Sequence, residues 1–219
     1  MSKTITRLFD NYSDAKSAVH QLEAMGVPHD DLSLVANNSD GAHGDGRDGD
    51  GDIDDVNDHG DVSRGTSTGA LLGGAGGLLA GLGLLAIPGL GPIVAAGWLA
   101  ATAAGAGLGA AGGAATGGIV GALKNAGHSD EEAHVYSEGV RRGGTLLSAR
   151  VPDDLATEAE AVLQRNNSVD AASRGAAYRQ DGWNTFDENA PAYTREQVSA
   201  ERGRYGAASE LTPGTGSSF

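Results

Sequence analysis

Residues 65–123 form a run of 59 residues without a charged side chain, and glycine recurs at every fourth position over two stretches of it. A four-residue spacing places such a row on one side of an α-helix, and a stripe without side chains lets two helix backbones approach closely. The spacing therefore predicts a helix-packing role for ten glycines. The first row is Gly65, Gly69, Gly73, Gly77 and Gly81, and the second is Gly105, Gly109, Gly113, Gly117 and Gly121.

The two rows are separated by the sequence Ile87-Pro88-Gly89-Leu90-Gly91-Pro92, which we interpret as a corner between two helices. We expect helices over about 65–87 and 93–123, packed antiparallel along their glycine faces. Because glycine disfavours a helix by about 1 kcal/mol relative to alanine, a flexible linker is the alternative. Leucine pairs at helical spacing, opposite the first glycine row, favour the helical hairpin.

The surroundings of this hairpin are not decided by the sequence. The first arm would span ~35 Å at about 1.5 Å per residue, which is enough for the hydrocarbon core of a bilayer. However, residues 109–118 contain no large apolar side chain, and only Arg64 and Lys124 flank the run. The two alternatives are therefore a lipid bilayer and a soluble homo-oligomer that associates through glycine faces.

The charged residues divide the chain at the same boundaries. The net charge is −2 over 1–38, −7 over 39–64, zero over 65–123, −4 over 124–172 and −1 over 173–219, and −14 in total. This acidity argues against nucleic acid as a partner, because phosphates need a basic surface. The chain has no cysteine, which excludes disulfides, thiolate metal sites and cysteine nucleophiles. The N-terminus lacks the apolar core of a secretory signal.

Residues 1–38 have the pattern of a strand, a helix and a second strand. Thr4–Phe9 alternates as a strand does, and Ser13 is the expected N-cap of the helix that follows. Gly26 ends this helix, and Leu32–Val35 forms the second strand.

Residues 124–172 repeat this pattern after one additional helix. Ser129–Glu132 is a capping box that begins the additional helix, and TLLSARV reads as a strand. Pro152-Asp153-Asp154 opens the next helix, and Val169–Ala172 is the last expected strand. The order predicts an α+β fold: a split βαβ, ferredoxin-like domain interrupted by the glycine-rich hairpin.

Residues 173–219 form a polar tail that holds six of the ten aromatic residues. Thr194-Arg195-Glu196-Gln197 is able to cap one short helix that ends at about Tyr205. We expect the rest of this tail to be largely disordered, because glycine and proline are spread along it.

Three stretches resemble the bacterial general stress proteins, also described as heat- or low-temperature-induced stress proteins. They are GLGLLAIPGLGPIVAAGWLAATAAGAG, SDEEAHVYSEGVRRGGTLLSARV and YRQDGWNTFD, and the resemblance covers most of residues 1–172. It implies stress-related expression and no established catalytic activity, and it supplies no functional residues. A location in the bacterial cytoplasm, or at the cytoplasmic face of the inner membrane, is expected.

The acidic loop, residues 39–64, raises the question of a cation site. Five aspartates occupy positions 1, 3, 5, 9 and 12 of a calcium-loop spacing, namely Asp50, Asp52, Asp54, Asp58 and Asp61. Asp55, however, stands where such a loop needs glycine, so a solvated loop is the preferred interpretation and a weak divalent-cation binder the alternative. The histidines His43, His59, His128 and His134 lack a short fixed spacing and are expected to be ordinary surface residues.

No catalytic arrangement stands out in the sequence. It has no phosphate-binding loop, no Ser–His–Asp order with supporting motifs, and no sign of a cofactor or a small-molecule substrate. We therefore expect a non-enzymatic stress-response protein. It would be membrane-associated or self-associating through the hairpin, and the alternative is a soluble oligomeric interaction module.

Overall fold

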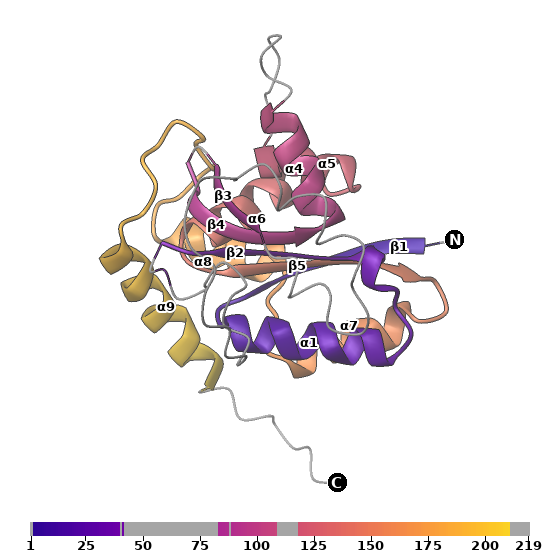
Figure 1. The fold of residues 1–219 in the computed structure, drawn as a ribbon. Helices are drawn as coiled ribbons and strands as arrows, with labels where there is room; N and C mark the ends of the chain where they lie inside the picture. Colours follow the sequence, from indigo (N-terminus) through magenta and orange to yellow (C-terminus); the bar gives the residue numbers. More distant parts are fainter. Residues whose placement is uncertain (1, 40, 42–82, 88, 109–117, 211–219) are drawn as a thin grey trace, which may run out of the picture.

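The computed structural model (Figure 1) describes residues 2–39, 41, 83–87, 89–108 and 118–210. The protein has an α+β fold built on an antiparallel sheet. Its strands are β1 (Ser2–Phe9), β2 (Leu32–Asn37), β3 (Gly83–Ile87), β4 (Gly91–Gly97) and β5 (Thr145–Pro152). Its helices are α1 (Tyr12–Ala24), the 3₁₀ helix η1 (His29–Asp31), α4 (Trp98–Leu108), α5 (Gly118–Asn125), α6 (Asp130–Arg141), α7 (Ala156–Arg165), α8 (Ala171–Gln180) and α9 (Arg195–Glu210).

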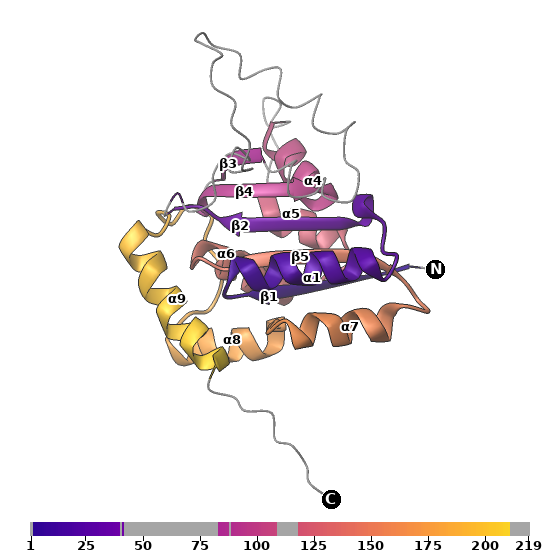
Figure 2. The same ribbon diagram turned by 60° about the horizontal axis from the view of Figure 1, so that its bottom comes forward.

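The described strands form one sheet in the order β1-β5-β2-β4-β3, which Figure 2 shows from bottom to top. β5 is antiparallel to β1 on one side and to β2 on the other, so β1 and β2 run parallel to each other. Helix α1 joins these two parallel strands. β4 pairs with the other side of β2, and β3 pairs with β4.

Both faces of the sheet are covered by helices of the same chain. Helices α1 and α7 cover one face, and α4, α5, α6 and α8 cover the other (Figure 1). Every residue of β2 is buried, as expected for a strand between two helical layers.

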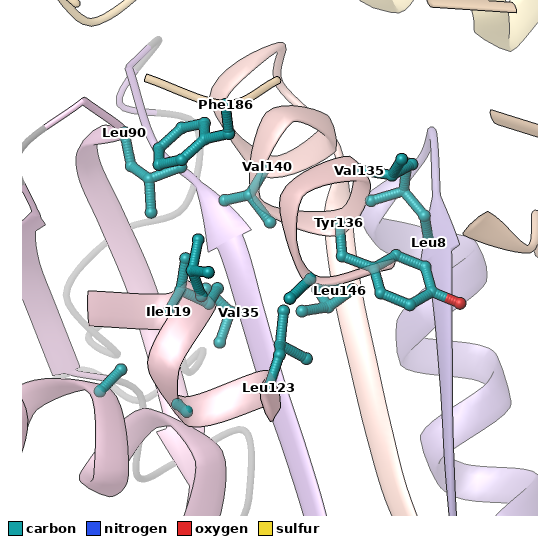
Figure 3. Close-up of a cluster of buried hydrophobic side chains, with 14 of the residues drawn as sticks. Leu8, Val35, Leu90, Ile119, Leu123, Val135, Tyr136, Val140, Leu146 and Phe186 are labelled. Carbon is teal, nitrogen blue, oxygen red and sulfur yellow. The ribbon is translucent and has the colours of Figure 1, made fainter. Parts of the chain in front are cut away.

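The larger core lies between the sheet and the helices α4, α5, α6 and α8 (Figure 3). Leu8, Val35 and Leu146 from three strands meet Ile119, Leu123 and Val140 from α5 and α6, and all six are buried. Tyr136 contributes its ring to this cluster, and its hydroxyl points away from it (Figure 3). Gly139 of α6 packs directly against Leu8, where any side chain would overlap the leucine methyl groups.

Several predicted helix ends are confirmed. Ser129 accepts from the N–H of Glu132, and the Glu132 carboxylate accepts from the N–H of Ser129, which completes the capping box at α6. Thr194 and Gln197 exchange the same pair of bonds at α9. For α1 the predicted N-cap is wrong, since Asn11 and not Ser13 precedes the first turn.

The predicted helices over 65–87 and 93–123 are wrong for residues 83–87 and 93–97, which belong to the β3–β4 hairpin. Leu90 N–H donates to Ile87 O at 3.1 Å, and Gly89, with φ +76°, has the left-handed conformation that glycine supplies in tight turns. β4 also finds hydrogen-bond partners along β2. A strand that is buried on both faces has no alternation of apolar and polar residues. The spacing of its apolar residues therefore does not distinguish it from a buried helix.

The second expected arm is present in part as α4 and α5, which pack against each other. Gly105 lies in α4 and Gly121 in α5. The other eight glycines of the two rows lie outside the described residues: Gly65, Gly69, Gly73, Gly77, Gly81, Gly109, Gly113 and Gly117. Within the described ranges, no helix combines the length and the apolar character needed to cross a bilayer.

The tail is more ordered than predicted. The expected helix that Thr194 caps is present as α9, but most of α8 also lies in the tail, so the expectation that the rest of the tail is disordered is wrong for residues 173–193. The reason is that Tyr178, Trp183, Phe186 and Val198 are buried against the rest of the chain. The predicted strand Val169–Ala172 is reduced to one bridge between Val169 and Leu8, because α8 begins at Ala171.

Candidate functional site

The outer edge of β1 is only partly paired within the described part of the chain. At one end Leu8 exchanges two backbone hydrogen bonds with Val169, of 3.0 and 2.7 Å. Successive residues of a strand point their backbone groups to opposite sides. The N–H and C=O groups of Thr4 and Thr6 therefore point outward, as those of Leu8 do, while Ile5 and Arg7 bond to β5.

Thr6 and Thr4 differ in how these outward groups are used. The carbonyl oxygen of Thr6 accepts from Tyr136 Oη at 2.7 Å and from Arg7 Nη1 at 3.0 Å. No described residue pairs with the N–H of Thr6 or with either backbone group of Thr4. Thr6 is 1% exposed, whereas Thr4 is half-buried, so it is the unpaired groups of Thr4 that a partner is able to reach. Unpaired backbone groups at a sheet edge are a template for an additional strand.

A cavity of about 450 Å³ lies along this edge. We call it the edge groove. β1 forms its floor, the α5–α6 turn and α6 form one wall, and Glu160 of α7 lies on the other side. It is lined by Lys3, Thr4, Ile5, Thr6, Arg7, Ala126, Gly127, His128, Glu132, Tyr136 and Glu160.

A chain of hydrogen bonds runs from the groove into the sheet. His128 Nε2 lies 2.7 Å from Thr6 Oγ1, which lies 2.8 Å from Ser148 Oγ. Burial lowers the pKa of His128, while Glu132, with Oε2 at 3.8 Å from Nδ1, raises it and Arg7 lowers it further. Burial also raises the pKa of Tyr136 to about 12. The imidazole is therefore neutral near pH 7, and the tyrosine stays a hydrogen-bond donor.

The order Glu132, His128, Thr6 resembles an acid, a base and a hydroxyl nucleophile, but the exposure of the groups argues against that use. Thr6 is 1% exposed and Ser148 is fully buried. A hydroxyl that a carbonyl carbon cannot approach does not act as a nucleophile. These bonds hold the start of α6 against the sheet and form the base of the edge groove.

A second, smaller hollow of about 370 Å³ lies where α6 and α8 meet residues 183–185. Its charged groups pair with one another: Glu131 forms an ion pair with Arg179, and His134 Nε2 lies 3.5 Å from Asp130. His134 Nδ1 also lies 3.2 Å from Thr185 Oγ1. This pairing leaves the second hollow with little capacity for a charged ligand.

The structure does not test the metal-site candidates that the sequence suggested. Asp50, Asp52, Asp54, Asp58, Asp61, His43 and His59 all lie outside them. Inside the described ranges, no group of three or more His, Cys, Asp and Glu side chains has the arrangement of a metal site. His128, expected to be a surface residue, has a side chain that is only 11% exposed.

The residues of the edge groove were not predicted as a site. Thr6 and His128 are 122 positions apart, and nothing local to either residue indicates the other. The edge position of β1 was not predicted either, because a ferredoxin-like order places a further strand beside the first one, and here only the bridge at Val169 pairs with that side of β1 among the described residues.

Comparisons with protein-family models, with curated proteins and with solved structures give no match for this chain. The resemblance to general stress proteins therefore stays a prediction from the sequence. The candidate site rests on the geometry of β1, α6 and α7 alone.

Proposed function

We propose that the protein is a non-enzymatic interaction protein of the bacterial general stress response that binds an extended segment of another protein at the outer edge of β1. The single observation that carries the binding role is the edge groove, in which the backbone groups of Thr4 have no described partner. The stress-response part rests on the sequence resemblance.

The dimensions of the groove support one extended chain as its occupant. A volume of about 450 Å³ falls within the range of about 300–1,000 Å³ that is common for ligand sites. Val169 already pairs with Leu8 as an antiparallel neighbour, so an incoming segment beside Thr4 would continue the line that Val169 begins. Binding by strand addition takes affinity from backbone hydrogen bonds and specificity from side chains.

A ferredoxin-like plan for the sheet is part of this proposal. It is supported by the position of β5 between the parallel strands β1 and β2, which α1 connects. In that plan a fourth strand would lie beside β1 after α7. Among the residues that the structure describes, only Val169 stands in that place, so an incoming segment would complete the sheet.

Helical walls favour a single segment over a second copy of the folded domain. The groove has α6 residues on one side and Glu160 of α7 on the other. Two such walled edges facing each other would bring helix against helix before the strands could pair. Self-association or bilayer contact through the two glycine rows of residues 65–123 is a separate proposal, which rests on the glycine spacing alone.

The test uses the full chain and a display library of heptapeptides. Thr4→Pro removes an outward N–H without removing a bond to β5, which an edge strand tolerates. Thr4→Val keeps the N–H and serves as the matched control. We expect selected peptides that bind the wild type and Thr4→Val alike and bind Thr4→Pro about tenfold or more weakly.

Two outcomes would overturn the proposal: peptides that bind Thr4→Pro as well as the wild type, or no selected peptide at all. A wild-type dimer that Thr4→Pro converts to a monomer would also overturn it, because the occupant would then be a second copy. Thermal unfolding of each variant checks that the fold is retained.

A further inference from the structure

Arg7 lies at the inner end of the edge groove, next to the position that Val169 closes. Its backbone bonds to β5, and its side chain crosses the strand edge so that Nη1 donates to Thr6 O at 3.0 Å. Tyr136 Oη donates to the same oxygen at 2.7 Å. An incoming segment that pairs with Thr4 would therefore reach the Arg7 guanidinium at its next residues.

The carboxylates around Arg7 already have other partners. Glu160 accepts from Lys3 Nζ at 2.8 Å. Glu132 accepts from the N–H and the hydroxyl of Ser129, each at 2.9 Å. Arg7 forms no ion pair with a described carboxylate, although it is partly buried. A guanidinium in this position has donors left for a ligand.

Asp170, the remaining acidic neighbour, is also engaged. Its carboxylate caps α8 by accepting from Ser173 N–H at 2.7 Å and Ser173 Oγ at 3.2 Å. The pKa of Asp170 is lowered first by that backbone bond and more weakly by Arg7. Arg7 therefore acts on its acidic neighbours at a distance and does not contact them as an ion-pair partner.

We propose that Arg7 receives a carboxylate of the incoming segment, so that the edge groove selects extended peptides with one carboxylate beside Thr6. This inference rests on the proposed strand-binding function. A guanidinium pairs with a carboxylate through two parallel N–H bonds, which gives geometric selectivity as well as charge. The carboxylate comes either from an Asp or Glu side chain or from the end of the partner chain.

The charges of the groove favour a carboxylate over a phosphate group. Glu132 and Glu160 line the same groove as Arg7. A phosphate carries about −1.5 to −2 at pH 7, so these two carboxylates would repel it more strongly than they repel a single carboxylate.

The experiment compares three peptides on the full chain: VTVDVTV and VTVNVTV, both with an amidated C-terminus, and VTVNVTV with a free C-terminus. The wild type should bind the Asp peptide or the free-terminus peptide about tenfold more tightly than the amidated Asn peptide. Whichever of the two is preferred identifies the source of the carboxylate. Anisotropy of a labelled peptide measures the affinity.

Arg7→Gln should abolish this preference, and Arg7→Lys should restore part of it, because lysine keeps the charge but not the paired donors. Equal binding of all three peptides by the wild type, or a preference that survives in Arg7→Gln, would overturn the role of Arg7. The Thr4→Pro variant shows whether only the role of Arg7 is wrong or strand binding at β1 is wrong as well. Peptides that bind without selectivity but are lost in Thr4→Pro leave strand binding intact, whereas binding unaffected by Thr4→Pro overturns both.

Discussion

Glu138 of α6 and Arg142, the C-cap residue of that helix, form a buried ion pair one helical turn apart, in which Arg142 Nε donates to Glu138 Oε1 at 2.7 Å. The Glu138 side chain is fully buried, and Arg142 is 10% exposed. Arg142 also pairs with Glu201 of α9 at 3.0 Å and lies 4.3 Å from the ring centre of Tyr178 on α8. The pair therefore joins three helices that are separate in sequence.

Replacing Glu138 by glutamine should lower the free energy of unfolding by up to about 3–5 kcal/mol, because Arg142 loses the fully buried one of its two carboxylate partners. Glu160→Gln is the matched control. Its pair with Lys3 is solvent-exposed, and screening limits the loss to less than about 1 kcal/mol. Urea unfolding of both variants measures the difference. Equal losses would contradict the buried role of Glu138.

Replacing Gly97 by alanine should destabilise the junction between β4 and α4. Gly97 has φ +88°, and an added Cβ would overlap the carbonyl oxygen of Leu32 on β2. Clash and backbone strain together should cost more than about 2 kcal/mol. Gly203→Ala in α9 meets no atom within 4 Å and should stabilise the helix by up to about 1 kcal/mol. The two thermal midpoints should thus move in opposite directions, and a Gly97→Ala midpoint at or above the wild-type value would refute the β2–β4 packing.

The buried imidazole of His128 should make the stability fall as the pH decreases through about 6.5. Its pKa in the folded protein is lowered from 6.5 by burial, so the unfolded chain takes up a proton that the folded chain does not. The stability from this residue is present above pH 6.5 and is lost below it. His128→Gln keeps a hydrogen-bonding side chain without the titration. Unfolding at pH 7 and pH 5 should show a larger loss for the wild type, and an equal loss would exclude His128 as the source.

Truncation separates the ordered part of the tail from its end. Deletion of residues 181–219 removes the buried side chains of Trp183, Phe186 and Val198, and it should abolish the cooperative thermal transition or lower its midpoint strongly. Deletion of 206–219 should leave the transition in place, because those residues carry little apolar periodicity. Loss of the transition in the shorter deletion would show that the end of the chain contributes to the core.

The sequence by itself determined those features whose partners are close along the chain. The capping boxes at Ser129 and Thr194 join residues three positions apart, so the side chains that begin α6 and α9 are visible in the sequence. The alternation of β1 and the apolar stripes of α1 and α7 are local in the same sense. These elements form where the patterns predict them, within a few residues.

The tertiary structure alone decided the features that depend on distant partners. The β3–β4 hairpin forms because β4 makes backbone hydrogen bonds to β2. The spacing of apolar residues in the sequence does not show this partner. Residues 173–210 are ordered because the rings of Tyr178, Trp183 and Phe186 fill a core made by residues far earlier in the chain. The edge groove exists because His128 meets Thr6 across 122 positions, while Val169 covers only one end of β1. Hydrogen bonding and burial depend on which residues are close in space. A sequence pattern shows only which residues are close along the chain.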